Sequence, residues 1–526
     1  MFVRPLFVLL LISAQTFCTV GRAQESGTQV SKKIWEVAVL FVGADEDQAY
    51  QKDVDGNILE LARLHPSESF RLTVFREQSF GGRALYFDVD SSTQIDWSAI
   101  LSEKPVAPLE LAPGFSKEFK KNRILSRGPE LSELFENAFR IPDSHRLLLI
   151  YGHGLGPKGL SESKLKDLRA SLEKALPSRI NHDSSPEKGP LDLLWLDACL
   201  MASVEVAYEL RGLTKLFVSS QDQEFATGSP MSALSILETG ELISDEELAV
   251  QLGESYLQSY SFIRGGEQSK SVITSPATLS VINVSKLGPL IEKLSDLVSL
   301  IGKLTPESRA ALSLRKDFRK MGDPDFSDLG FLIQKMGELG EIPVQAQTLA
   351  KEIQILLELG QPASRNSNVQ IELETPIENA LMVYGYNWWG AGYEGDQTFE
   401  GKIPEALTPD RQVKGPDGRL WPAKVINQSI SFSPFTPNAN EFRYYFADPF
   451  TEEPISEEVI YTRTRDNMSF RAESDSNPVI WVGYTEGVGA AAERYTGLSI
   501  LEPTQGATNI PYLELEFALK TRWGAL

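Results

Sequence analysis

The chain has 526 residues, of which 72 are Asp or Glu and 51 are Lys or Arg, so its formal net charge at pH 7 is −21. Nucleic acids and anionic membranes attract clusters of Lys and Arg, so neither is predicted as a partner of this acidic chain. The length is sufficient for two or more domains with a sizeable core.

The N-terminus has the pattern of a secretory signal peptide. Arg4 precedes an apolar run at residues 6–12, and Gly21 and Ala23 are the small residues expected just before a cleavage site. The apolar run is shorter than the roughly 20 residues that a membrane-spanning helix needs. We therefore predict that residues 1–23 are removed and that the protein is exported, to the periplasm or the extracellular space, without a membrane anchor.

Cleavage after Ala23 would remove Cys18 and leave Cys199 as the remaining thiol. A lone cysteine can form neither an internal disulfide nor a thiolate zinc site. It is therefore either an inert buried residue or a reactive one, and its surroundings must decide between them.

From about residue 34, short apolar runs alternate with amphipathic helical patterns. Continuous apolar runs of this kind are typical of strands that are buried on both faces of a parallel sheet. The sequence therefore predicts an α/β fold, with a mainly parallel sheet sandwiched by helices. The predicted strands are residues 35–43, 145–154, 191–198, 214–220 and 277–285.

The C-terminal part of the chain changes in character. Helical patterns dominate up to about residue 360, and residues 361–496 are rich in Pro, Gly, Asn and aromatic residues in short alternating runs. Such runs predict a β-rich insert or second domain. Residues 497–526 read as a strand and an amphipathic helix that return to the core of the domain formed by residues 34–360.

Two polar side chains follow neighbouring predicted strands. His153 comes after "LLLIYG", and Cys199 comes after "LLWLDA" at or near the predicted start of a helix. Ligands and catalytic groups gather beyond the carboxyl ends of parallel strands, and a helix N-terminus lowers the pKa of a thiol. Although each residue alone could be structural, the pair predicts a His/Cys dyad, with the glycines of "GHGLG" allowing a substrate to approach.

Three segments resemble the clostripain family of cysteine peptidases, in the caspase-like clan. They are "YGHGLG", "LDACLMASVEVAYEL" and "FVSSQDQEFATGSP", and the resemblance covers roughly residues 34–360 and 497–526. It implies that Cys199 attacks a peptide carbonyl to form a thioester and that His153 is the acid and base. It also implies an oxyanion hole formed by the N–H groups of Gly154 and Cys199.

The resemblance also implies a substrate pocket that prefers Arg or Lys before the cleaved bond. Asp197, two residues before Cys199, matches one pocket acid of the family, and residues two apart in a strand face the same way. Where relatives have a second acid, in "PGDGWPY", this chain has Thr227 in "FATGSPM". The basic preference is therefore left open, with Asp222 and Glu224 as nearby acids.

Relatives also cut themselves between the His and Cys strands, and self-cleavage is expected here after Lys166, Arg169, Arg179 or Lys188. No metal or other cofactor is needed for the chemistry. Calcium supports some relatives, but the run "DVDGN" at 53–57 lacks the spacing of a calcium loop.

Three functions remain open at this point. The first is an exported cysteine endopeptidase acting on peptides or proteins, and the second is a peptidase of the same mechanism with non-basic specificity. The third is an idle caspase-like scaffold whose C-terminal region binds a protein or glycan. The aromatic residues of the insert fit such a surface or the core of a small β domain.

Overall fold

A computed structural model describes much of the unit Lys33–Leu526, one of two compact units into which the chain divides. Residues 1–33, which include the predicted signal peptide and Cys18, lie outside the described residues. Between residues 54 and 64, the described positions are 54, 57, 58, 60, 61 and 64. The described ranges are 34–43, 66–78, 83–89, 128–161, 163–176, 189–224, 228–240, 243–259, 262–264, 277–304, 325–338, 342–362, 412–414, 420–422, 424–427, 441–447, 459–463, 467–485, 495–501 and 510–525.

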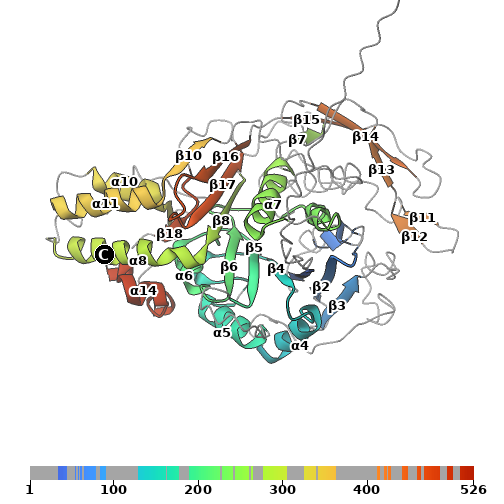
Figure 1. Cartoon of the computed structure of the whole chain (residues 1–526), viewed down its shortest axis with the longest axis horizontal. Helices are drawn as coiled ribbons and strands as arrows, with labels where there is room; N and C mark the ends of the chain where they lie inside the picture. The colour runs from blue at the N-terminus through green and yellow to red at the C-terminus, as the bar shows by residue number, and fades with distance from the viewer. Residues whose placement is uncertain are drawn as a thin grey trace, which may run out of the picture. The chain divides into compact units, whose positions relative to one another are not determined.

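The central element is a ten-stranded sheet with the order β10-β16-β17-β8-β6-β5-β4-β1-β2-β3 (Figure 1). The five strands from β6 to β2 pair in parallel, and the strands on either side of them pair antiparallel. The strand bounds are β1 Trp35–Phe41, β2 Phe70–Gln78, β3 Arg83–Val89, β4 His145–Tyr151, β5 Leu191–Asp197, β6 Thr214–Ser219, β8 Thr278–Asn283, β10 Leu359–Pro362, β16 Asn467–Ala472 and β17 Val479–Thr485.

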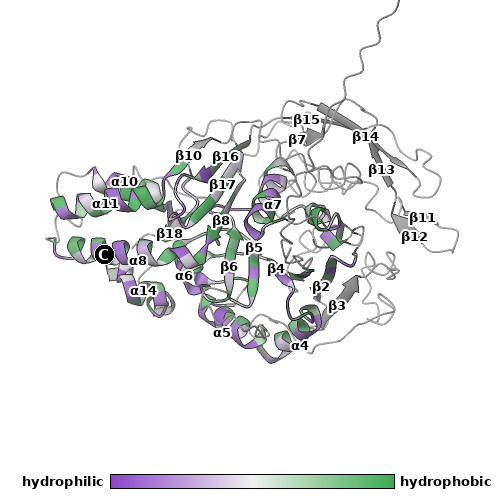
Figure 2. Cartoon of the chain, in the orientation of Figure 1, coloured by the Kyte–Doolittle hydropathy of each residue, from purple (hydrophilic) through white to green (hydrophobic). Residues whose placement is uncertain are grey.

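The central strands form because nearly every side chain on them is apolar and buried. In β5, Leu194 and Leu196 point into one core cluster, and Leu193 and Trp195 point to the opposite face. Successive side chains of a strand alternate between faces, so a run without polar residues requires cover on both sides. The hydropathy view shows these strands as largely hydrophobic (Figure 2).

Helices provide that cover. On one face, side chains of α4 (Gly128–Ala138), α5 (Leu165–Ala175), α6 (Val204–Glu209) and α8 (Leu287–Ile301) share a core cluster with the sheet. Helix α7 (Asp245–Ser259) contacts β6, β8 and β17 on the other face. There, a Cβ on Gly253 would lie only 2.7 Å from the Trp481 ring, so only glycine lets α7 pack this closely. The prediction of a mainly parallel sheet sandwiched by helices is confirmed.

The C-terminal segment packs beside the loop that follows β5. Strand β18 (Ser499–Leu501) pairs with β9 (Phe326–Asp328), and Ser499 donates its N–H to the Ala202 carbonyl at 2.9 Å. Two acids of α6 accept N–H groups from the same segment, Glu205 from Leu501 and Glu209 from Phe517, both at 2.9 Å. Helices α10 (Leu329–Gly337), α11 (Val344–Leu356), α13 (Ile510–Leu513) and α14 (Glu516–Thr521) complete this side.

The strands described within 361–496 do not all form one group. Strands β11 (Gln412–Lys414) and β12 (Leu420–Pro422) pair with each other, and β13 (Lys424–Asn427), β14 (Glu441–Ala447) and β15 (Val459–Arg463) form a small sheet with β7 (Phe262–Arg264). In contrast, β16 and β17 belong to the central sheet. The boundary of the predicted insert stays a prediction.

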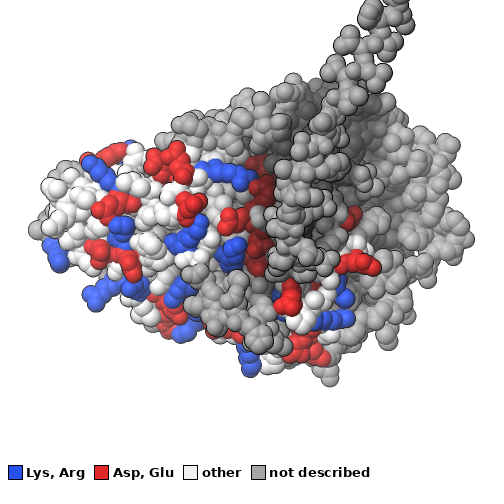
Figure 3. All heavy atoms as spheres, viewed as in Figure 1, with Lys and Arg blue, Asp and Glu red and all other residues white. Residues whose placement is uncertain are grey.

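None of the described helices is long and apolar enough to cross a membrane. On the face seen in Figure 3, Lys and Arg side chains are interspersed with Asp and Glu side chains over the described residues.

Candidate active site

The carboxyl ends of β4 and β5 place His153 and Cys199 at matching positions. Tyr151, the last residue of β4, is paired with Asp197, the last residue of β5, in a parallel register. His153 and Cys199 each follow two residues later. Because the two strands are direct neighbours, both residues leave the same edge of the sheet side by side.

Gly154 brings the two loops into contact. A Cβ placed on Gly154 would lie 2.1 Å from the carbonyl oxygen and 2.9 Å from the nitrogen of Cys199. Any other residue would therefore push the loop after β4 away from the loop after β5. The glycine noted in the sequence is needed for this close backbone approach.

Ser161 fixes the loop that carries His153. The His153 N–H donates to the Ser161 hydroxyl at 3.1 Å, and the Ser161 N–H donates to the His153 carbonyl at 2.7 Å. Ser161 has a φ of 40°, in the region that favours glycine. This bracing leaves the His153 side chain exposed to solvent. Sequence reasoning missed Ser161, because no local pattern distinguishes it from other loop serines.

The loop that carries Cys199 is also held in a strained conformation. Leu200, the next residue, has a φ of 61°, and its N–H donates to the Asp222 carbonyl at 2.9 Å. A non-glycine residue in this region costs of order 1–3 kcal/mol and persists only where its surroundings enforce it. Such strain is common at functional sites.

The expectation that Cys199 lies at the start of a helix is wrong. Helix α6 begins at Val204, and Ser203 is its N-cap, with its hydroxyl accepting the Val206 N–H at 3.2 Å. Residues 199–202 form an irregular loop instead. Cys199 is therefore too far from the first turn of α6 for the helix dipole to act strongly on its thiol.

The thiol of Cys199 is half-buried and does not ionise easily in this conformation. Its Sγ accepts the Glu224 N–H at 3.2 Å and lies 3.7 Å from the Glu224 carbonyl oxygen. Burial raises the pKa of Cys199, and the charges of Asp222 and Asp197 raise it further, outweighing the Glu224 N–H. The predicted lowering of this pKa is therefore contradicted.

Slow alkylation of Cys199 is expected from this environment. Iodoacetamide reacts with thiolates, so a Cys18→Ser chain should react more slowly than free cysteine at neutral pH, and its rate should keep rising above the ordinary thiol pKa of about 8.5. Mass spectrometry of the modified peptide measures this rate. A chain that reacts faster than free cysteine near pH 7 would contradict the raised pKa.

Asp197 and Glu224 form a second pair of ionisable groups close to the thiol. Both side chains are buried, and an oxygen of each, Asp197 Oδ1 and Glu224 Oε1, has no hydrogen-bond partner among the described residues. Asp197 Oδ2 accepts the Ser229 N–H at 2.8 Å. Burial raises the pKa of Asp197 to about 6, and burial together with the Asp197 charge raises the pKa of Glu224 well above its usual range.

Gly228 and Tyr151 close around this carboxyl pair. A Cβ on Gly228 would lie 2.4 Å from the Tyr151 ring and 2.7 Å from Asp197 Oδ2, and its φ is 64°. Thr227, the residue expected in place of a second pocket acid, lies outside the described residues. Asp222 is buried, and the Tyr495 hydroxyl donates to its Oδ2 at 3.4 Å. Among the described residues, the acids near the thiol thus include Glu224. Its position depends on how the chain folds back after β6.

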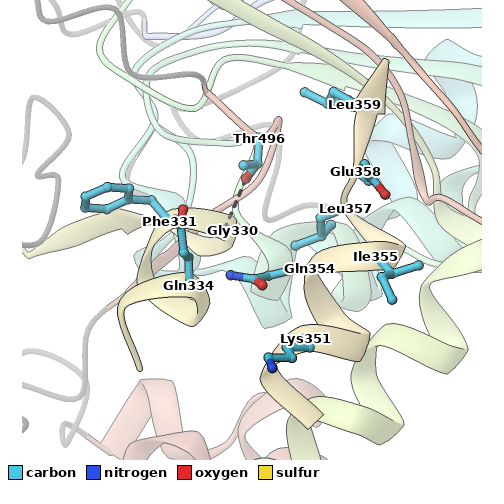
Figure 4. A pocket seen from close by; sticks show the side chains of 10 residues that line it. All are labelled: Gly330, Phe331, Gln334, Lys351, Gln354, Ile355, Leu357, Glu358, Leu359 and Thr496. Atoms are coloured by element: carbon cyan, nitrogen blue, oxygen red, sulfur yellow. Dashed lines mark hydrogen bonds between the residues drawn. The ribbon is translucent and has the colours of Figure 1, made fainter. Parts of the chain in front are cut away.

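A separate hollow of about 680 Å³ lies between α10, α11 and the segment at Thr496 (Figure 4). None of the candidate site residues lines it. Its wall is nevertheless tied to the site, because Asp328 accepts the Thr496 N–H at 2.7 Å and the Gln221 amide at 3.0 Å. Gln221 directly precedes Asp222 in the chain. The candidate active site is therefore the sheet edge that carries His153 and Cys199, rather than this hollow.

Comparison with known proteins places these features in a family. The model of the clostripain family (peptidase family C11) matches residues 129–386, a span that contains both His153 and Cys199. No curated protein matches the chain.

Solved structures of C11 proteases are also similar to this chain. One is an inactive zymogen C11 protease from Parabacteroides distasonis, with 13% identity, a TM-score of 0.47, and coverage of 93% of this chain and 97% of that one. Another is a secreted C11 cysteine protease from Bacteroides thetaiotaomicron in complex with an irreversible peptide inhibitor, with 18% identity, a TM-score of 0.39, and coverage of 61% and 82%. Residues 129–386, which include His153 and Cys199, thus match the clostripain family of cysteine peptidases.

Proposed function

We propose that the chain is an exported endopeptidase in which Cys199 is the nucleophile and His153 the acid and base. The register of β4 and β5 carries this proposal, because it sets both residues at one sheet edge, with Gly154 against the Cys199 backbone. Export rests on the signal-peptide pattern of residues 1–23. The chemistry uses side chains and backbone groups of this chain and needs no cofactor.

The proposed reaction begins with proton transfer from the Cys199 thiol to the His153 imidazole. This transfer is required because burial keeps the thiol protonated in the observed conformation. The thiolate then attacks the carbonyl carbon, and the N–H groups of Gly154 and Cys199 donate to the oxyanion. The imidazolium protonates the leaving amine as the C–N bond breaks. Water, deprotonated by the imidazole, hydrolyses the thioester to release the acid and the thiol.

We further propose that the residue before the cleaved bond is basic and that Asp197 binds it. Asp197 ends β5 two residues before Cys199 and has a buried oxygen without a partner. Glu224 supplies a second carboxyl at this position. A guanidinium entering between them would displace the proton that burial now holds there and would form charge-assisted hydrogen bonds. Thr227 is proposed to line the same pocket without contributing charge.

Profiling with a library of peptides tests this function directly. We expect cleavage after Arg or Lys by the wild-type chain and no cleavage by the Cys199→Ala chain. Cleavage after other residues would retain the mechanism and overturn the basic preference. No cleavage of any peptide by the fully processed chain would instead favour an idle scaffold. The hydrogen bond from the Glu224 N–H to the Cys199 thiol is consistent with that alternative.

Self-cleavage is proposed in the segment between β4 and β5. Lys166 and Arg169 lie within α5, and Arg169 donates from its guanidinium to the Glu209 carbonyl at 2.6 Å, so neither fits the extended form that a protease cleft binds. Arg179 and Lys188, outside the described residues, are therefore the expected sites.

Intact mass spectrometry of the wild-type and Cys199→Ala chains checks self-cleavage. We expect two fragments from wild type, with a cut after Arg179 or Lys188, and one chain from Cys199→Ala. An Arg169→Gln chain is the control, because it should still cut. One chain from both wild type and Cys199→Ala, or two fragments from both, would rule out self-processing.

A further inference from the structure

Three possible metal ligands from separate elements meet at the edge of the sheet opposite Cys199. His145 is the first residue of β4, Asp192 is near the start of β5, and Asp245 begins α7. Their ligand atoms all lie within 4.8 Å of one another. Because β4 and β5 run in parallel, their amino ends are at the edge away from the candidate dyad. The peptidase proposal uses none of these three residues.

The three donor atoms lie near one another, and the second oxygen of each carboxylate has a partner outside the cluster. His145 Nδ1 lies 2.8 Å from Asp245 Oδ1 and 4.0 Å from Asp192 Oδ1. The second oxygen of Asp192 accepts the Arg146 N–H at 2.8 Å, and that of Asp245 lies 3.4 Å from Lys215 Nζ. Such outer partners orient the ligands of a metal site.

The His145 ring and the Asp245 Oδ1 atom also have features of a preformed metal site. The His145 ring stacks on Trp35, with centroids 4.8 Å apart and planes at 22°, which fixes the direction of Nδ1. Asp245 Oδ1 is shielded from solvent and has His145 Nδ1 as its hydrogen-bond partner, at 2.8 Å. A buried carboxylate oxygen in this situation is stabilised by a cation.

We propose that His145 Nδ1, Asp192 Oδ1 and Asp245 Oδ1 bind one divalent transition-metal ion, with Zn²⁺ the best match. One imidazole and two carboxylates suit zinc, which has bonds of about 2.0–2.2 Å and leaves a fourth position to water. Ligands of a tetrahedral zinc ion are then about 3.4 Å apart, a value between the 2.8 and 4.0 Å separations observed here. The ion would join β4, β5 and α7.

The alternative is an ion pair between a protonated His145 and Asp245. The charged groups in contact with them are Asp192 on β5 and Lys215 on β6. A protonated imidazole donates its Nδ1–H to Asp245 Oδ1 and attracts Asp192 by charge, so the pair alone satisfies much of the cluster. Zinc binding distinguishes the two, because a metal ion requires the neutral imidazole.

Isothermal titration of the full chain with ZnCl₂ tests the proposal. A Cys18→Ser/Cys199→Ala background removes both thiols, so that Cys199 and His153 cannot hold zinc, and the titration is run at pH 7.5. We expect one zinc ion per chain. Adding His145→Gln or Asp245→Asn should weaken binding by about 100-fold or more, and adding Asp475→Asn, an exposed acid, should not change it.

Lys215→Gln provides the discriminating measurement, and it decides the matter even if the ligand variants unfold. Removing this ammonium leaves all three donors and takes away a positive charge, so zinc should bind equally well or more tightly. Absence of zinc binding in the thiol-free background, or full retention in both ligand variants, would overturn the proposal. A chain that binds no zinc, but melts at a lower temperature when Asp245→Asn is introduced, would have the ion pair alone.

Discussion

Replacing Cys199 by Ala is expected to reduce peptide hydrolysis by about 10⁴-fold or more, because no other group on this sheet edge can form the thioester. His153→Ala should cause a loss of similar size. The double variant should be little worse than either single one, since groups that act as a unit are far from additive. Steady-state rates on one peptide substrate, with active protein counted by mass, measure all three.

Ser299→Ala, an exposed position on α8, is the matched control and should keep wild-type activity. Thermal unfolding of each variant should stay close to wild type, because Cys199 is half-buried and His153 is exposed. Residual hydrolysis in Cys199→Ala at the wild-type level would show that another nucleophile carries the reaction.

Asp197→Asn is expected to lower kcat/KM on peptides with a basic residue before the cut by about 100-fold or more, since it leaves the buried cation without its countercharge. The loss should be much smaller on peptides with an apolar residue there. Glu224→Gln should cost less, because burial raises the pKa of Glu224 and so favours its neutral form, whose shape Gln keeps. Equal losses on basic and apolar peptides would remove Asp197 from the specificity pocket.

The pH dependence of the same reaction supplies a second test of Asp197. Its pKa of about 6 means that the carboxylate forms as pH rises from 5 to 7, so activity on basic peptides should rise over this range. Asp197→Asn should lose that part of the rise. The variant should also be more stable than wild type above pH 6, because a carboxyl whose folded pKa is raised loses stability as pH rises from its unfolded to its folded value.

The sequence predicted the centre of this molecule well, for a physical reason. Strands such as Leu191–Asp197 have an uninterrupted apolar run from Leu193 to Leu196, and only a sheet covered on both faces buries such a run. The strand ends then placed His153 and Cys199 on one edge. Local pattern was sufficient because the two residues follow directly from neighbouring parallel strands.

Features that depend on distant segments were not predictable in this way. Glu224 reaches the thiol and Asp197 only because the chain folds back after β6. Burial raises the pKa of Cys199, and the Glu224 N–H offsets only part of that rise. Likewise, β17 joins the central sheet by pairing with β8, a partner far away in the chain. Periodicity identifies a strand, but its neighbours are set by pairing that no local window contains.

The hydrogen bonds from the C-terminal segment to α6, the helix that follows the Cys199 loop, bear on the order in which the chain folds during synthesis. Glu205 and Glu209 obtain their N–H partners from Leu501 and Phe517, so a nascent chain that still lacks these residues leaves two buried carboxylates of α6 without them. Unpaired buried carboxylates oppose folding of the helix that follows Cys199. Helix α6 can therefore reach the arrangement seen here only after the residues up to Phe517 have been synthesised.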